Sequence, residues 1–191
     1  MNIALCGAHG VGKTTLGWEL YRHYQAEHKA FLVQGIARGI IARGYSLGAA
    51  ATMDSYVEYI IEQLSALSRA GEYEIYISDR TLLDPYAYAL VNQRNGQSLI
   101  TLRELELLRR VWELEQKEYC LYLYLPVQFP LEQDGIRPAD KEYQNQISQT
   151  VLGLLQDYHL PYLSIIGNQK EMMQQAVAKI SDLMPLGKSN T

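Results

Sequence analysis

Hydrophobic residues along this chain gather in short continuous runs, which alternate with longer stretches where they recur every three or four positions. Short runs are typical of strands buried on both faces of a sheet, and the periodic stretches are typical of helices with one buried face. The pattern predicts strands at residues 2–6, 30–33, 74–78, 120–125 and 162–166. It predicts helices at residues 15–25, 53–70, 84–91, 102–112, 143–158 and 172–184.

This alternation predicts an α/β fold, in which a parallel sheet carries helices on both faces. With 191 residues the chain is long enough for one sizeable core, so we expect a single domain over residues 1–184. Residues 126–140, rich in proline, glycine and charge, predict a loop, and residues 185–191 predict a loose tail. In sheets of this kind ligands bind beyond the carboxyl ends of the strands, so residues directly after strands are the site candidates.

Composition narrows the class of partner. The net charge is −4, and no basic stripe is present, which argues against nucleic acid as a partner. No run of 18 apolar residues occurs, so we expect no membrane-spanning segment. A strand that begins at residue 2 leaves no room for a signal peptide, and Cys6 and Cys120 lie in apolar runs where free buried thiols are common. We therefore expect a cytoplasmic protein without a disulfide.

The segment after the first strand carries the strongest chemical signal. Its residues fit the phosphate-binding pattern G-x-x-x-x-G-K-S/T, and they are Gly7, Ala8, His9, Gly10, Val11, Gly12, Lys13 and Thr14, followed by Thr15. Lys13 would reach the terminal phosphates of a nucleotide, and the Thr14 hydroxyl would bind Mg²⁺. A glycine-rich turn could match by accident, but the strand before it and the helix after it favour a true P-loop. The expected cofactors are ATP and Mg²⁺.

The third strand is followed by a charged pair, Asp79 and Arg80. Phosphoryl transfer needs a carboxylate near Mg²⁺ or near the attacking hydroxyl group, and cations around the moving charge. Asp79 could serve in either carboxylate role, and Arg80 could hold a phosphate or a polar acceptor. The alternative is a capping aspartate paired with its neighbour, which is harder to place at the mouth of a P-loop sheet.

Residues after the second and fourth strands complete the candidate site. Gln34 and Arg38 follow the second strand, where an acceptor would lie, although Arg38 could equally lie on a solvated helix face. Arg137 lies in the 126–140 loop, which could close over ATP and neutralise charge in the transition state, unless it is a plain exposed loop. Asp84 is expected to be a helix cap. Glu58, Glu62 and Gln63 are expected to face solvent, although one of them could face the acceptor pocket.

The P-loop, residues 34–38, residues 78–88 and residues 134–138 together resemble the P-loop kinases of nucleosides and nucleotides. The chain is most similar to ATP-binding domains of the ribosylnicotinamide-kinase-like, AAA-type group, and Asp79-Arg80-Thr81 resembles the D-R-S/T region of deoxynucleoside and thymidylate kinases. The resemblance implies a three-layer fold with a five-stranded parallel sheet in the order 2-3-1-4-5. It also implies a lid loop that carries an arginine.

For individual residues, the resemblance implies Asp79 and Arg80 at the acceptor and Arg137 at the ATP phosphates. One position departs from the family pattern, because relatives often have an acidic residue where this chain has Gln34. An amide cannot act as a base, so either Asp79 takes that role or the chemistry is weaker.

The sequence therefore predicts a Mg²⁺- and ATP-dependent kinase for a small acceptor, either a nucleoside or a nucleotide. A second hypothesis is an ATP-binding regulatory or interaction module that hydrolyses ATP slowly. The sequence leaves the oligomeric state open, a homodimer included.

Overall fold

A computed structural model describes residues 1–128 and 140–184. Most of the predicted loop at 126–140, with Arg137 in it, and the predicted tail at 185–191 lie outside the described residues. Within the described ranges no helix is long and apolar enough to cross a membrane.

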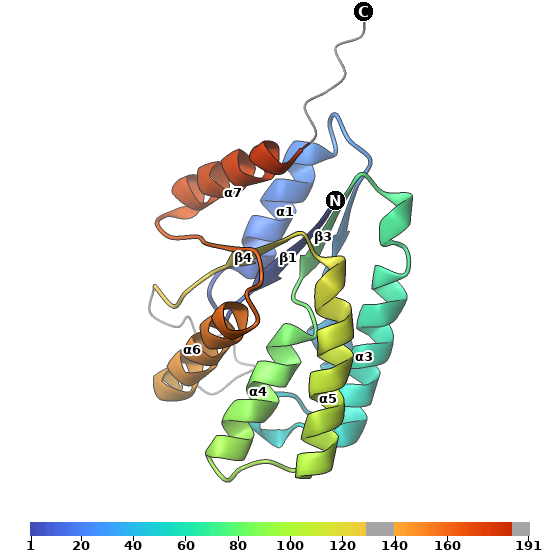
Figure 1. The fold of residues 1–191 in the computed structure, drawn as a ribbon, viewed down its shortest axis with the longest axis vertical. Helices are drawn as coiled ribbons and strands as arrows, with labels where there is room; N and C mark the ends of the chain where they lie inside the picture. The colour runs from blue at the N-terminus through green and yellow to red at the C-terminus, as the bar shows by residue number, and fades with distance from the viewer. Residues whose placement is uncertain (129–139, 185–191) are drawn as a thin grey trace, which may run out of the picture.

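Five parallel strands form one sheet in the spatial order β2-β3-β1-β4-β5 (Figure 1). Their bounds are Asn2–Cys6 for β1, Ala30–Val33 for β2, Ile75–Asp79 for β3, Leu121–Tyr124 for β4 and Tyr162–Ser164 for β5. β1 is central, because its Ile3 is in register with Ile77 of β3 on one side and Leu121 of β4 on the other. The five predicted strands and the order 2-3-1-4-5 are confirmed.

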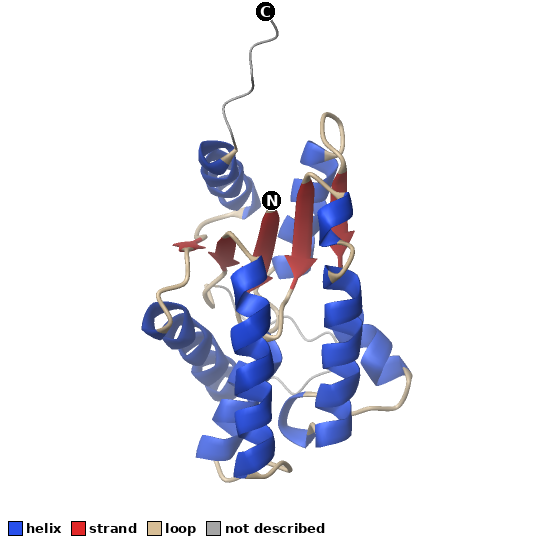
Figure 2. Ribbon diagram, turned by 45° about the vertical axis from the view of Figure 1, so that its right-hand side comes forward, coloured by secondary structure: helices blue, strands red, loops and turns tan. Residues whose placement is uncertain are grey.

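Helices cover both faces of this sheet, as predicted (Figure 2). α1 and α7 pack on one face, and α3, α4, α5 and α6 lie on the other, with the short α2 after β2. The bounds are Lys13–Tyr24 for α1, Ile36–Ala42 for α2, Met53–Leu67 for α3, Leu83–Arg94 for α4, Leu102–Glu115 for α5, Lys141–Asp157 for α6 and Gln169–Leu183 for α7.

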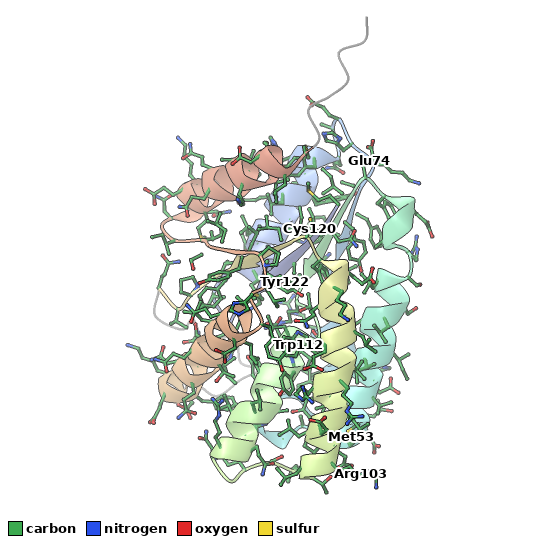
Figure 3. All side chains as sticks on the ribbon, viewed as in Figure 1. Met53, Glu74, Arg103, Trp112, Cys120 and Tyr122 are labelled. Carbon is green, nitrogen blue, oxygen red and sulfur yellow. The ribbon has the colours of Figure 1, made fainter. Side chains whose placement is uncertain are left out.

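Aromatic rings fill the core between the sheet and the α3–α6 side. Trp112 is fully buried there, with the ring of Tyr86 stacked at 5.1 Å and the ring of Tyr158 edge-on at 4.6 Å. Tyr76 and Tyr122 of the strands are also fully buried in this core (Figure 3). Much of the chain's high tyrosine content therefore lies in the core, where the rings supply large apolar surface.

Three local features differ from the sequence prediction. α2 was missed, because it is only seven residues long and contains a glycine and an arginine that blur the apolar period. The helix predicted at 53–70 ends at Leu67, and a short 3₁₀ turn, Ala70–Glu72, follows it. Both cysteines are free as expected, but Cys120 is exposed, because β4 begins only at Leu121.

Two glycines of the P-loop have backbone conformations that other residues rarely adopt. Gly7 has φ of 134° and Gly12 has φ of 91°. A Cβ atom at Gly7 would collide with the carbonyl oxygen of Leu125, whereas a Cβ atom at Gly12 would meet no atom within 4 Å. Alanine substitutions at the two positions therefore distinguish the free-energy cost of backbone strain from that of a steric clash.

We expect Gly7→Ala to lower the free energy of unfolding by about 3 kcal/mol, since it adds a backbone clash to the strain. Gly12→Ala should lower it by about 1 kcal/mol, because only the strain remains. Urea unfolding of the two variants beside the parent protein measures both values. Equal losses at the two positions would contradict the proposed close approach of Gly7 to Leu125.

Candidate functional site

Lys13, the first residue of α1, lies at the centre of the P-loop. Its side chain is nearly buried, and its ammonium group donates hydrogen bonds to the carbonyl oxygens of Gly7, at 2.8 Å, and Ala8. No side chain caps α1 at Gly12, and its first turn contains no acidic residue. The N–H groups of the first helical turn and the positive end of the helix dipole therefore favour an anion at this point, as a phosphate site requires.

Thr14 and Asp79 form the candidate Mg²⁺ site. The Thr14 hydroxyl donates a hydrogen bond of 2.5 Å to Oδ2 of Asp79. The other carboxylate oxygen, Oδ1, is buried and accepts no hydrogen bond from the described residues. Mg²⁺ prefers oxygen ligands and is commonly held by one or two protein side chains together with phosphates. The donor set fits this ion, and Mg²⁺ bound there would neutralise phosphate charge.

Arg80 turns the chain sharply at the end of β3. Its φ is 88°, an uncommon value for a residue with a side chain, and its N–H donates to the Leu5 carbonyl at 3.0 Å. The guanidinium group forms an ion pair with Asp84 at 3.1 Å, and both side chains are largely buried. Burial lowers the pKa of Arg80, but the Asp84 carboxylate, together with smaller contributions from two tyrosines and Asp79, outweighs this effect and raises the pKa. Arg80 is thus a permanent cation beside the candidate Mg²⁺ site.

A cluster of buried polar side chains supports the turn at Arg80 from the side of the core. The Ser78 hydroxyl donates to the Arg80 carbonyl at 2.6 Å, and the Gln63 amide nitrogen donates to Ser78 at 3.0 Å and to the Tyr119 hydroxyl at 3.1 Å. Gln63 is fully buried, so its predicted exposure is wrong. Strained turns persist where the surrounding structure fixes them, and this cluster supplies that support.

Glu115 of α5 completes the cluster. Its carboxylate accepts hydrogen bonds from the Leu82 N–H at 2.8 Å and from the Tyr119 hydroxyl at 3.3 Å. Burial raises the pKa of Glu115 to about 8, although these hydrogen bonds oppose the shift. A buried group of this kind binds a proton near neutral pH, so the stability of the turn is linked to pH.

The Asp84 side chain lies beside Arg80 in the site, and the prediction that it caps a helix is wrong. The cap position of α4 is Leu82, and Asp84 lies inside the first turn, where its side chain accepts from the Thr81 N–H at 3.4 Å and pairs with Arg80. Burial raises the pKa of Asp84, while the nearby charges of Arg80 and Lys13 lower it. The cap rule failed here because the ion pair with Arg80, four residues earlier, determines the position of this carboxylate.

A cavity of about 490 Å³ opens beside Arg80 and Asp84. α2 and α3, the segment between them, α4 and the start of α6 line it. Five tyrosines contribute to the lining: Tyr45, Tyr56, Tyr59, Tyr88 and Tyr143. Burial raises the pKa of Tyr56 and Tyr59, so their hydroxyl groups stay protonated at neutral pH. The cavity therefore offers flat aromatic surfaces and neutral hydrogen-bonding groups, which suit a planar ring.

The P-loop and the cavity are physically connected through His9. Its Nδ1 atom is 2.9 Å from the Tyr88 hydroxyl, and its carbonyl oxygen accepts a hydrogen bond of 2.6 Å from Gln144 of α6. The Tyr143 hydroxyl donates to Asn92 at 2.7 Å, and Asn92 donates to the Gly48 carbonyl at 2.9 Å. His9, placed in the phosphate-binding segment by the sequence, thus also lines the cavity.

The structure brings some predicted residues together and separates others. Lys13, Thr14, Asp79 and Arg80 converge, whereas Gln34, Arg38 and Thr15 are exposed, and none of these three lines the cavity. The substrate role of Gln34 and Arg38 stays a prediction, as does the role of Arg137. Sequence reasoning missed the tyrosine lining. The excess of tyrosine, with Tyr56 and Tyr59 three positions apart on one helix face, was the available signal.

A family model described as AAA domain matches residues 2–171, so the chain belongs to this family. The fold is shared with a NadR protein and with a deoxyadenosine kinase. No curated protein sequence matches the chain.

Solved structures share the fold at low sequence identity. A NadR protein in complex with NR has a TM-score of 0.76 and 16% identity, and the match covers 100% of this chain and 54% of that one. The chain thus spans about half the length of NadR. Deoxyadenosine kinase from M. mycoides, with dCMP and dCDP bound, has a TM-score of 0.71 and 15% identity. The match covers 96% of this chain and 100% of the kinase chain.

The Glu115 cluster makes a testable contribution to stability. Because the pKa of Glu115 is raised in the folded protein, the folded state holds its proton more tightly than the unfolded state. This contribution is complete below the unfolded pKa and is lost as the pH rises through about 8. We expect Glu115→Gln to remove this pH-dependent contribution. Between the unfolded pKa of the carboxyl group and about 8, the free energy of unfolding of the parent should fall relative to that of the variant by up to about 1.4 kcal/mol per pH unit.

Urea unfolding of the parent and of Glu115→Gln between pH 5 and pH 9 measures this difference. The difference should level off above the raised pKa. A difference that is constant across the whole range would contradict the raised pKa of Glu115.

Proposed function

We propose that the protein transfers the γ-phosphoryl group of ATP, with Mg²⁺, to a hydroxyl group of a small nucleoside-like molecule bound in the tyrosine-lined cavity. One observation carries the proposal: the last residue of β3 and the residue that follows it connect the two halves of the site. Asp79 is hydrogen-bonded to the P-loop threonine, and Arg80 lines the cavity. ATP at the P-loop and an acceptor in the cavity would therefore meet at these residues.

Each residue would have a defined task. The acceptor hydroxyl oxygen attacks the γ-phosphorus and loses its proton to solvent, the bond from that phosphorus to the β,γ-bridging oxygen breaks, and ADP leaves. Lys13 and the N-terminus of α1 would hold the phosphates, Thr14 and Asp79 would hold Mg²⁺, and Arg80 would stabilise charge on the transferred group. Arg137 would add a second cation from the loop. Positioning and charge stabilisation dominate such reactions, so an amide at Gln34 is compatible with turnover.

The charges around the cavity favour a nucleoside over a nucleotide as the acceptor. Among the described lining residues, Arg80 is the only lysine or arginine, and Asp84 already forms an ion pair with it. An acceptor phosphate would need its own cations for binding. Neutral tyrosine hydroxyls and rings instead suit an uncharged sugar and a planar base. Two proteins of similar fold, a NadR protein with NR bound and a deoxyadenosine kinase, support a small nucleoside-like acceptor.

Release of ADP in the presence of individual nucleosides and nucleoside monophosphates tests the proposal. We expect at least one nucleoside to raise ADP release well above the rate with ATP and Mg²⁺ alone, and monophosphates to act weakly. ADP release that no acceptor raises would instead favour the second candidate, an ATP-binding regulatory module with slow hydrolysis.

Lys13→Ala is the matched test of the phosphate site in the same assay. We expect it to remove about 2–4 kcal/mol of transition-state stabilisation, as does the loss of one preorganised donor. Lys170→Ala, at an exposed position of α7, is the control and should leave the rate unchanged. Turnover of Lys13→Ala at the parent rate would contradict the role of the P-loop.

Asp79→Asn separates a role at Mg²⁺ from a purely structural one. The amide oxygen can still accept the hydrogen bond from Thr14, but the negative charge is lost. We therefore expect kcat to fall by about 100-fold or more while the Kd for nucleotide without Mg²⁺ changes little. Measurement of kcat and Kd side by side distinguishes the two roles, and a kcat within a few-fold of the parent value would leave Asp79 with only a structural role.

A further inference from the structure

His9 belongs to both halves of the site. Among the described residues that line the cavity, it is the one that comes from the P-loop. The residue is nearly buried, and Nδ1 of its ring lies 2.9 Å from the hydroxyl oxygen of Tyr88 on α4, a hydrogen bond that either tautomer of the ring can make. None of the tasks in the proposed phosphoryl transfer uses this ring.

The backbone of His9 is held by a second helix, α6. Gln144 is buried, and its side-chain N–H donates a hydrogen bond of 2.6 Å to the His9 carbonyl oxygen. The ring and the carbonyl group are thus bonded to two different helices, and both helices contribute residues to the cavity lining. Buried hydrogen bonds are strong because little water competes for the groups. The position of the P-loop at His9 therefore depends on α4 and α6.

α4 extends this contact to a part of the cavity lining that is distant in sequence. Tyr88 and Asn92 are four positions apart, so they lie on the same face of the helix. The Tyr143 hydroxyl donates to Oδ1 of Asn92 at 2.7 Å, and the side-chain N–H of Asn92 donates to the Gly48 carbonyl oxygen at 2.9 Å. Contacts thus run continuously from the P-loop through α4 to the residues around Gly48.

Residues 44–51, which we call the wall segment, are well suited to respond to these contacts. All of them line the cavity, and most are glycine or alanine. Gly44 and Gly48 have φ of 91° and 73°, and the regular structure of the segment is one 3₁₀ turn, Gly48–Ala50. A segment with small side chains and little regular structure opens at a low free-energy cost. Its order therefore depends on bonds such as the one from Asn92.

We propose that His9 is a positioning residue that couples the two halves of the site: nucleotide at the P-loop orders the wall segment through His9, Tyr88 and Asn92. The coupling rests on the proposed function in one respect, which is that the cavity holds the acceptor. Bound phosphates would fix the P-loop backbone, so that the His9 ring holds Tyr88 in one position. An acceptor then loses less conformational entropy when it binds to a wall segment that is already ordered. Because coupling of binding sites is reciprocal, the acceptor would in turn favour bound nucleotide.

Hydrogen exchange of the full chain with and without ADP and Mg²⁺ tests the coupling, because it requires neither an acceptor nor turnover. ADP also lacks the γ-phosphoryl group that would touch an acceptor directly. We expect bound ADP to slow amide exchange in the wall segment by about 5-fold or more, the lower end of the usual coupling between two sites. Calorimetry on the same samples measures the Kd for ADP.

Variants of His9 and Tyr88 test the route. We expect His9→Ala and Tyr88→Phe to bind ADP with a Kd within a few-fold of the parent value, because backbone N–H groups and Lys13 hold the phosphates. Both variants should lose the slowing in the wall segment, and the double variant should lose no more than either one, since all three lack the same contact. His9→Asn places a hydrogen-bonding atom near the position of Nδ1 and should restore part of the slowing.

Tyr158→Phe is the matched control. It removes a hydroxyl group that donates to Glu113 at 2.9 Å, and Tyr158 does not line the cavity, so this variant should keep the slowing. Circular dichroism reports whether each variant is folded, and Tyr88→Phe, which removes a single hydroxyl group, tests the route even if His9→Ala does not fold.

Two results would overturn the coupling and leave the proposed phosphoryl transfer intact. One is ADP that binds to the parent without slowing exchange in the wall segment. The other is slowing that Tyr88→Phe keeps in full. A parent protein that does not bind ADP at all would contradict the P-loop site itself, and the coupling with it.

Discussion

The left-handed turn at Arg80 is the constraint on which the site depends. Successive residues of a strand point to opposite faces of the sheet, and the end of β3 uses this alternation. Ser78 points into the polar cluster under α3, and Asp79 points toward the P-loop. The turn then directs the next side chain into the cavity. Asp79 and Arg80 therefore join the P-loop to the tyrosine-lined cavity.

Buried polar groups in the surrounding core hold the turn at Arg80 in place. Gln63, Tyr119 and Glu115 are buried, and a buried polar group destabilises a protein unless it is hydrogen-bonded. Here the groups bond to one another and to the backbone around Arg80. The polar cluster therefore stabilises a locally strained conformation that the hydrophobic packing around Trp112 would not by itself specify.

Local patterns in the sequence were sufficient for the strands of the sheet and for the convergence of Thr14 with Asp79. The P-loop residues and Asp79 follow directly from strand ends, because the ends of parallel strands meet at one edge of the sheet. The strand order came from the family resemblance and is confirmed. These features depend on contacts close in the chain, or on a topology common to many sequences.

The acceptor cavity could not be predicted in the same way. Its tyrosines come from α3, α4, α6 and the segment before α3, so their convergence depends on how each helix is rotated about its axis. Gln63 and Asp84 were misjudged for a related reason. Local rules place a glutamine outside and an aspartate at a helix cap, whereas here Gln63 of α3 bonds to Ser78 of β3, and Asp84 pairs with Arg80 in the turn after that strand. Specific hydrogen bonds and an ion pair outweighed the general preference of each residue type.

The most direct measurement is to follow the γ-phosphoryl group itself. The protein is incubated with ATP labelled in the γ-phosphate, Mg²⁺ and a nucleoside, and the labelled products are separated and identified by mass spectrometry. If the P-loop and the tyrosine-lined cavity form one site, the label will appear on a nucleoside hydroxyl group, and Lys13→Ala will abolish this product. Label that is found only in inorganic phosphate, whichever nucleoside is supplied, would contradict a single site that joins ATP and acceptor.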